Sequence, residues 1–282
     1  MNMNKKNAIL GLWLLAIPWA QAAPPAPAAH GKFPDPTLKP ELVIKAEPGP
    51  TTYTTNKGKL DGGSFAVYVP KAYSPEKPMP LVVSSHGAGG TGPKEIGGWT
   101  RFAEQYGFIV VCPSYASATT HSALNLLPGI ISQDEKHLKD IMERVFKSLN
   151  IDRAHVMHTG FSGGGAPTWY AAMKHPEWFT ALCFRSANFW GEKAETISKK
   201  SDWKTRPIYI FWGDKDNPII ITKSPVMGGG EGPAALDFLK KMHCQKLKHE
   251  ILPGGTHDSH PDLAAKWFGE EVMGAEAPAT KK

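Results

Sequence analysis

The chain has 282 residues, of which 41% are hydrophobic, and a formal net charge of +6. This length and apolar content are enough for one globular domain with a sizeable core, which argues against a disordered protein. The charges are scattered along the sequence rather than gathered in a basic patch, so we expect no nucleic-acid partner.

The first 22 residues have the three parts of a secretory signal peptide. Lys5 and Lys6 form a basic start, residues 8–19 an apolar core, and residues 20–22 an Ala-x-Ala cleavage site. The apolar core is shorter than the ~20 residues that cross a membrane, and no cysteine stands near the cleavage site to carry a lipid. We therefore expect an exported protein, periplasmic or secreted, without a membrane anchor.

Three parts follow the cleavage site: a Pro/Ala-rich lead-in over residues 23–40, a single domain over 41–274 and a polar tail over 275–282. The predicted strands are residues 42–45, 51–55, 63–70, 81–85, 108–113, 154–158, 181–186, 207–212 and 248–252, and the predicted helices are residues 99–106, 133–149, 166–173, 233–242 and 263–272. This alternation predicts an α/β fold, with helices on both faces of a mostly parallel central sheet. Ligand sites in such sheets lie at the carboxyl ends of the strands.

Residues 159–165, Thr-Gly-Phe-Ser-Gly-Gly-Gly, join a predicted strand to a predicted helix. A serine between glycines at such a junction is the pattern of a nucleophile elbow, which makes Ser162 the candidate nucleophile. The turn is so tight that side chains at Gly160 and Gly164 are expected to clash.

A serine nucleophile needs a base within hydrogen-bond reach, and His257 follows the last predicted strand in a glycine-rich loop. His260 and His175 are the nearest rivals. His175 stands at the far end of the helix after Ser162, roughly 20 Å away along its axis, which is too far. We therefore expect His257 to be the base.

The base needs an acid that orients it, and two aspartates follow the strand over residues 207–212. Asp214 touches the strand end, where a structural loop bond is the alternative role, so Asp216 is preferred. The resulting chain order of Ser, Asp and His is that of α/β-hydrolases. For the oxyanion, the expected donors are the backbone N–H groups of Gly163 and of Ala88, which lies in the glycine-rich loop over residues 86–90.

No pattern predicts a cofactor or a metal ion. The chain lacks the Walker spacing, and its three cysteines show no zinc-ligand spacing. Cys112 and Cys183 stand in apolar runs and are expected to be buried free thiols. Of the tryptophans, Trp169 and Trp212 are expected in the core, and Trp190 is the candidate for a wall of the substrate pocket.

The sequence resembles the α/β-hydrolase superfamily, and within it secreted esterases of the poly(3-hydroxybutyrate) depolymerase, feruloyl esterase and acetylxylan esterase type. The matching stretches include Pro80-Leu81-Val82-Val83 with His86-Gly87, Trp99 with residues 103–108, residues 150–153, 160–165 and 175–179, Gly213 with Asp216, and Gly255 with His257. Phe161 departs from the pattern, because a smaller residue or leucine often stands there. The loops over residues 114–128 and 187–206 match nothing recognisable.

The resemblance implies a serine esterase acting on a small-molecule or polymer-linked carboxylic ester. Two other functions are weighed beside it. A peptidase of the prolyl-oligopeptidase type has the same triad but usually carries a large extra domain, for which the mature chain has no room. A binding protein on the same fold has no need of a triad and an oxyanion loop.

Overall fold

The computed structural model describes residues 42–54, 63–119, 128–189, 203–221 and 231–275. The predicted signal peptide, the lead-in over residues 23–40 and all but the first residue of the tail lie outside the described residues. Within the described ranges, no helix is both long enough and apolar enough to cross a membrane.

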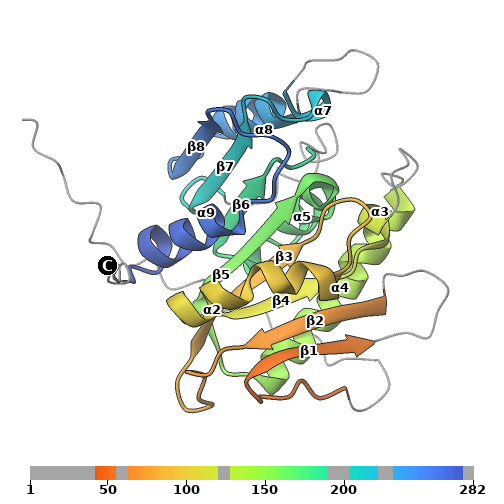
Figure 1. The fold of residues 1–282 in the computed structure, drawn as a ribbon, viewed down its shortest axis with the longest axis vertical. Helices are drawn as coiled ribbons and strands as arrows, with labels where there is room; N and C mark the ends of the chain where they lie inside the picture. The colour runs from red at the N-terminus through yellow and green to blue at the C-terminus, as the bar shows by residue number, and fades with distance from the viewer. Residues whose placement is uncertain (1–41, 55–62, 120–127, 190–202, 222–230, 276–282) are drawn as a thin grey trace, which may run out of the picture.

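The fold is built on one eight-stranded sheet in the order β1-β2-β4-β3-β5-β6-β7-β8 (Figure 1). The strands are β1 (Gly49–Thr54), β2 (Ser64–Val69), β3 (Met79–Ser85), β4 (Ile109–Pro113), β5 (Ile151–Phe161), β6 (Ala181–Arg185), β7 (Ile208–Gly213) and β8 (Leu247–Leu252). β2 pairs antiparallel with both β1 and β4, and every pairing from β4 to β8 is parallel. The predicted α/β fold with a mostly parallel sheet is therefore confirmed.

Helices cover both faces of the sheet, as parallel strands joined by helical crossovers require. α4 (Pro128–Ser148), α5 (Gly165–Lys174) and α8 (Glu231–Lys241) pack into the larger apolar cluster on one face. α2 (Thr100–Tyr106) and α9 (Pro261–Lys266) lie side by side over the other (Figure 1). The short elements are α1 (Gly92–Glu95), η2 (Ile96–Gly98), α3 (Ala116–Thr119), η4 (Ser162–Gly164), η5 (Pro176–Trp178), α7 (Pro218–Ile221) and the π-helical turn η6 (Trp267–Val272).

Side-chain burial follows most of the sequence-based expectations. Trp169 is 0% exposed and Trp212 4%, so both belong to the core. Cys112 and Cys183 are buried free thiols, as predicted.

The strand predicted over residues 42–45 is wrong, because that segment is irregular and precedes the sheet, which begins with β1.

Candidate active site

Ser162 stands where β5 ends and η4 leads into α5, with its backbone at a φ of 49°. This left-handed conformation is strained for a residue with a side chain. Both predicted glycine requirements hold. A Cβ at Gly160 would lie 2.6 Å from the carbonyl oxygen of Gly164, and one at Gly164 would lie 2.4 Å from the carbonyl oxygen of His86.

The structure brings together the side chains of Ser162, His257 and Asp216, which come from three loops at the carboxyl end of the sheet. His257 Nε2 is 2.8 Å from Ser162 Oγ, and His257 Nδ1 is 2.5 Å from Asp216 Oδ1. If Nδ1 carries the proton that Asp216 accepts, Nε2 is free to take the proton of the serine hydroxyl.

The carboxyl group of Asp216 is held in its ionised form inside the protein. Its side chain is 0% exposed, against 30% for that of His257. Burial by itself raises the pKa of Asp216, but hydrogen bonds from His257, the Ser186 hydroxyl and the Asn217 N–H hold this pKa below its usual value. The result is a fixed negative charge beside the imidazole.

Asp214, the alternative acid, has a different partner. Its Oδ1 accepts a hydrogen bond from the Gly254 N–H at 2.7 Å, and its side chain is exposed. It therefore joins the turn after β7 to the turn after β8, which is the loop bond considered as the alternative from sequence.

The two rival histidines are also engaged elsewhere. His175 Nε2 donates to Glu135 Oε1 at 2.7 Å, and its ring stacks on Trp178, with ring centroids 3.9 Å apart. His260, at a φ of 40°, precedes α9, and its Nδ1 lies 3.8 Å from Asp262. Neither ring bonds to Ser162 in the described part of the chain.

The loop after β3 lies directly against the elbow. A Cβ at Gly87 would lie 2.8 Å from the ring of Phe161 and 3.5 Å from the Cβ of Ser162. The Ala88 nitrogen lies 3.2 Å from the point that a Cβ on Gly163 would occupy. The two amides expected to hold an oxyanion are therefore neighbours beside the serine.

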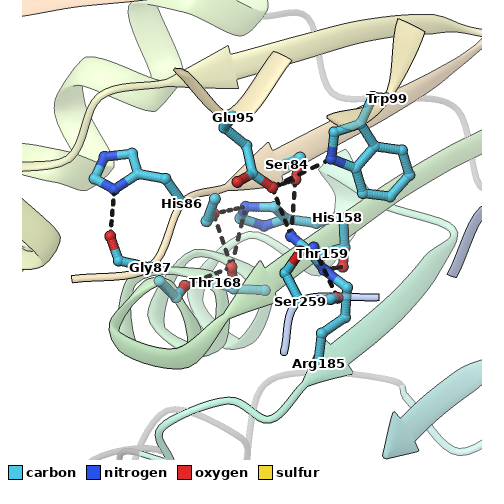
Figure 2. A network of polar contacts seen from close by, with 12 residues as sticks. Ser84, His86, Gly87, Glu95, Trp99, His158, Thr159, Thr168, Arg185 and Ser259 are labelled. Carbon is cyan, nitrogen blue, oxygen red and sulfur yellow. Dashed lines mark hydrogen bonds and ion pairs between the residues drawn. The ribbon is translucent and has the colours of Figure 1, made fainter. Parts of the chain in front are cut away.

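His86 orients one of these two amides. Its Nε2 accepts the Tyr115 N–H at 3.0 Å, so Nδ1 carries the proton and donates to the Gly87 carbonyl at 2.8 Å (Figure 2). That carbonyl also accepts the Gly90 N–H at 3.0 Å. In a trans peptide the N–H points opposite to the C=O, so both bonds turn the Ala88 N–H away from His86. Burial lowers the pKa of His86, which keeps this ring neutral.

Phe161 and Trp190 bear on the shape of the site. Phe161 lies between the loop after β3 and His257, with its ring centroid 5.0 Å from that of His257. Trp190, the candidate pocket wall, lies outside the described residues.

Ser186 is a site residue that the sequence reasoning missed. It follows β6 at a φ of 45°, its carbonyl accepts the Ser162 N–H at 3.1 Å, and its side chain helps to lower the pKa of Asp216. Its position at the carboxyl end of a predicted parallel strand was the available signal. No group of three or more potential metal ligands occurs among the described residues.

A sequence profile of the dienelactone hydrolase family matches residues 65–228. The chain belongs to the dienelactone hydrolase family. The matched segment includes Ser162 and Asp216 and ends before His257. A curated relative, the probable acetylxylan esterase A of Neosartorya fischeri, is 30% identical over 155 residues, which are 50% of this chain and 39% of the relative. The chain thus matches well under half of that protein's length.

Solved structures show that this dienelactone hydrolase family member has the α/β-hydrolase fold. The poly(3-hydroxybutyrate) depolymerase LpqC from Bordetella parapertussis superposes with a TM-score of 0.59 at 15% identity, over 80% of this chain and 90% of that one. The acetyl xylan esterase from Aspergillus awamori gives a TM-score of 0.56 at 19% identity, over 78% and 99% of the two chains. At these identities the likeness establishes the fold.

A further histidine, His158, lies beneath the site of this family member, in β5. Its Nε2 is 3.2 Å from the Ser85 hydroxyl and 3.4 Å from the Thr168 hydroxyl (Figure 2). Its Nδ1 has no partner in the described part of the chain, and its ring packs 4.5 Å from that of Phe179. Complete burial lowers the pKa of His158 to about 3.

This lowered pKa predicts a loss of stability in acid. Unfolded histidine binds a proton below about pH 6.5, whereas folded His158 stays neutral, so its contribution is complete above pH 6.5 and is lost as the pH falls. When the pH falls from 7.5 to 5.0, this group should lower the free energy of unfolding of wild type by ~2 kcal/mol. A His158→Gln variant should not show this loss. Urea unfolding of both proteins at the two pH values measures the difference. A stability gap between them that is independent of pH would contradict the prediction.

Proposed function

We propose that this chain is a serine hydrolase that cleaves carboxylic esters. Ser162 is the nucleophile, His257 the general base and Asp216 the acid that orients it. The backbone N–H groups of Ala88 and Gly163 hold the oxyanion of the tetrahedral intermediate.

The reaction then runs in two halves. Ser162 Oγ bonds to the ester carbonyl carbon while its proton passes to His257 Nε2. The C–O bond to the alcohol breaks, and the alcohol leaves with that proton, so an acyl-enzyme remains. Water repeats the attack with His257 as base, releases the carboxylic acid and restores the Ser162 hydroxyl.

The observation that carries this proposal is the hydrogen-bonded chain from Asp216 through His257 to Ser162, with its distances of 2.5 and 2.8 Å. The names of two similar proteins, a probable acetylxylan esterase and an acetyl xylan esterase, support an ester as the bond that is cleaved. Because the curated relative is much longer than the matched segment, its substrate is carried over only as a class: a small-molecule or polymer-linked ester.

A substrate panel tests the proposal. We expect turnover of nitrophenyl esters with acyl chains from acetate upward, and of acetylated xylan, feruloyl esters or hydroxybutyrate oligomers when the loops admit them. A fluorophosphonate should inactivate the protein with one label per chain, located on Ser162 by peptide mass spectrometry. Faster cleavage of matched anilides than of esters would replace the esterase by a peptidase. An inert, unlabelled protein would favour a binding role.

Export is the remaining part of the proposal. It is supported by the basic start, the apolar core and the Ala-x-Ala site within the first 22 residues. A protein recovered from the medium or the periplasm should begin at Ala23, which N-terminal sequencing reads directly. A protein that keeps Met1 in the cytoplasm would contradict export.

A further inference from the structure

Arg185 ends β6 and is 0% exposed, which is unusual for an arginine. Its guanidinium donates from all three nitrogens, as Figure 2 shows. The partners are Thr159 Oγ1 at 2.9 Å, Ser84 Oγ at 2.9 Å, Glu95 Oε1 at 2.9 Å and the Ser259 carbonyl oxygen at 3.1 Å. The Cζ atom of the guanidinium also lies over the ring of Trp99, 5.2 Å from the ring centroid.

Glu95 in α1 is the counter-ion of this buried cation. Burial raises the pKa of the Glu95 carboxyl, but Arg185, the Ser84 hydroxyl and the Trp99 N–H together hold the pKa below its usual value. The pair is therefore ionised. A buried ion pair often adds little to stability compared with apolar side chains of the same volume, so its presence calls for another explanation.

The guanidinium of Arg185 also holds the backbone of the loop that carries His257. Ser259 stands two residues after His257, in the loop between β8 and α9. Among the described residues, residues 257–260 make hydrogen bonds outside the β8–α9 segment only through His257, to Ser162 and Asp216, and through Ser259, to Arg185. Gly254 and Gly255 hold the start of this loop to Asp214 and Lys215, and Arg185 is the anchor of its second half, residues 258–260.

The backbone next to Arg185 reaches the other two members of the triad. Ser186 accepts the Ser162 N–H on its carbonyl oxygen at 3.1 Å, and its side chain is one of the groups that lower the pKa of Asp216. Arg185 and Ser186 therefore connect the loops of Ser162, Asp216 and His257 to the end of β6.

We propose that Arg185 is a positioning residue, which sets His257 between Ser162 and Asp216 by holding the Ser259 carbonyl, with Glu95 as its counter-ion. This inference rests on the proposed hydrolase function. Arg185 does not touch the reacting atoms, so it acts on the geometry of the base. A displacement of about 1 Å in a catalytic group is enough to cost roughly 100-fold in rate.

The test variant is Arg185→Lys. Lysine keeps the positive charge beside Glu95 but has one nitrogen in place of the planar fork, so it cannot also hold Ser259. We expect kcat for a nitrophenyl ester to fall about 100-fold with KM changed less than threefold. The rate of labelling by fluorophosphonate should fall in parallel, at an unfolding midpoint that shows the protein to be folded.

Arg206→Lys is the matched control. Arg206 donates to the carbonyls of Pro176 and Phe179 and lies over the ring of Trp203, away from the triad. Both bonds come from Nη1, so its replacement also alters guanidinium bonds to backbone carbonyls, and it should leave kcat within twofold of wild type. If Arg185→Lys proves unstable, the double variant Arg185→Met/Glu95→Gln removes both charges together and should show the same loss of kcat.

A proton NMR measurement separates failure of this inference from failure of the proposed function. The Nδ1 proton of His257, bonded to Asp216, should give a far-downfield resonance that is absent in His257→Gln. In Arg185→Lys this resonance should shift or broaden, and in Arg206→Lys it should stay. Wild-type kcat and an unshifted resonance in Arg185→Lys would overturn the positioning role. If wild type cleaves no ester, the hydrolase proposal fails, and the resonance alone decides the role of Arg185.

Discussion

Replacement of Ser162 by alanine is expected to lower kcat for a small ester by a factor on the order of 10⁶. Ser162 Oγ lies 2.8 Å from His257 Nε2, and no other hydroxyl bonds to that ring among the described residues. Without it, the base has no nucleophile to activate, and only the weak effects of binding and of the oxyanion donors remain. Initial rates with purified wild type and Ser162→Ala measure the loss.

Contamination and misfolding are the two errors to control in that measurement. Ser162→Ala should unfold at nearly the wild-type temperature, since the hydroxyl adds one partly buried hydrogen bond. The variant should also take up no fluorophosphonate. Retention of more than one per cent of the wild-type rate in a folded, unlabelled variant would remove Ser162 from the mechanism.

Replacement of Asp216 by asparagine is expected to lower kcat by about 10⁴-fold with little change in KM. The fully buried carboxylate accepts the Nδ1 proton of His257 at 2.5 Å and balances the imidazolium that forms during the reaction. An amide of the same shape carries no charge, and its NH₂ group favours the tautomer with the proton on Nε2, which cannot accept a proton from Ser162.

Asp214→Asn is the matched control for this prediction. Asp214 accepts the Gly254 N–H at 2.7 Å, and asparagine keeps an oxygen for that bond. We expect kcat within threefold of wild type. If Asp214→Asn were the damaging change and Asp216→Asn the mild one, the acid of the site would be reassigned.

Features that depend on local chemistry were predicted well from sequence. The elbow is one, because the tight strand-to-helix turn at Ser162 leaves room only for glycine at Gly160 and Gly164. The end of α2 is another, since the helix predicted over residues 99–106 stops where Gly107 adopts a φ of 71°. In each case the backbone requirement and the residue that meets it stand next to each other.

Element boundaries were predicted less well where tertiary pairing extends an element beyond its apolar run. β5 begins at Ile151, ahead of the predicted strand over residues 154–158, because Ile151 pairs with Met79 of β3 before a shift in register. α4 begins at Pro128 rather than at residue 133. The predicted strand over residues 42–45 is absent because no neighbouring strand pairs with it.

The sequence by itself determined the fold class and placed Ser162, His257 and the two candidate acids at one edge of the sheet, since alternating strands and helices imply a parallel sheet whose strand ends converge. Only the tertiary structure separated Asp216 from Asp214, which stand two residues apart on one turn and point to different partners. Only it joined Arg185 to Glu95 and to the Ser259 carbonyl. Hydrogen bonds between residues so far apart in the chain depend on how the strands pack, and no local pattern records that packing.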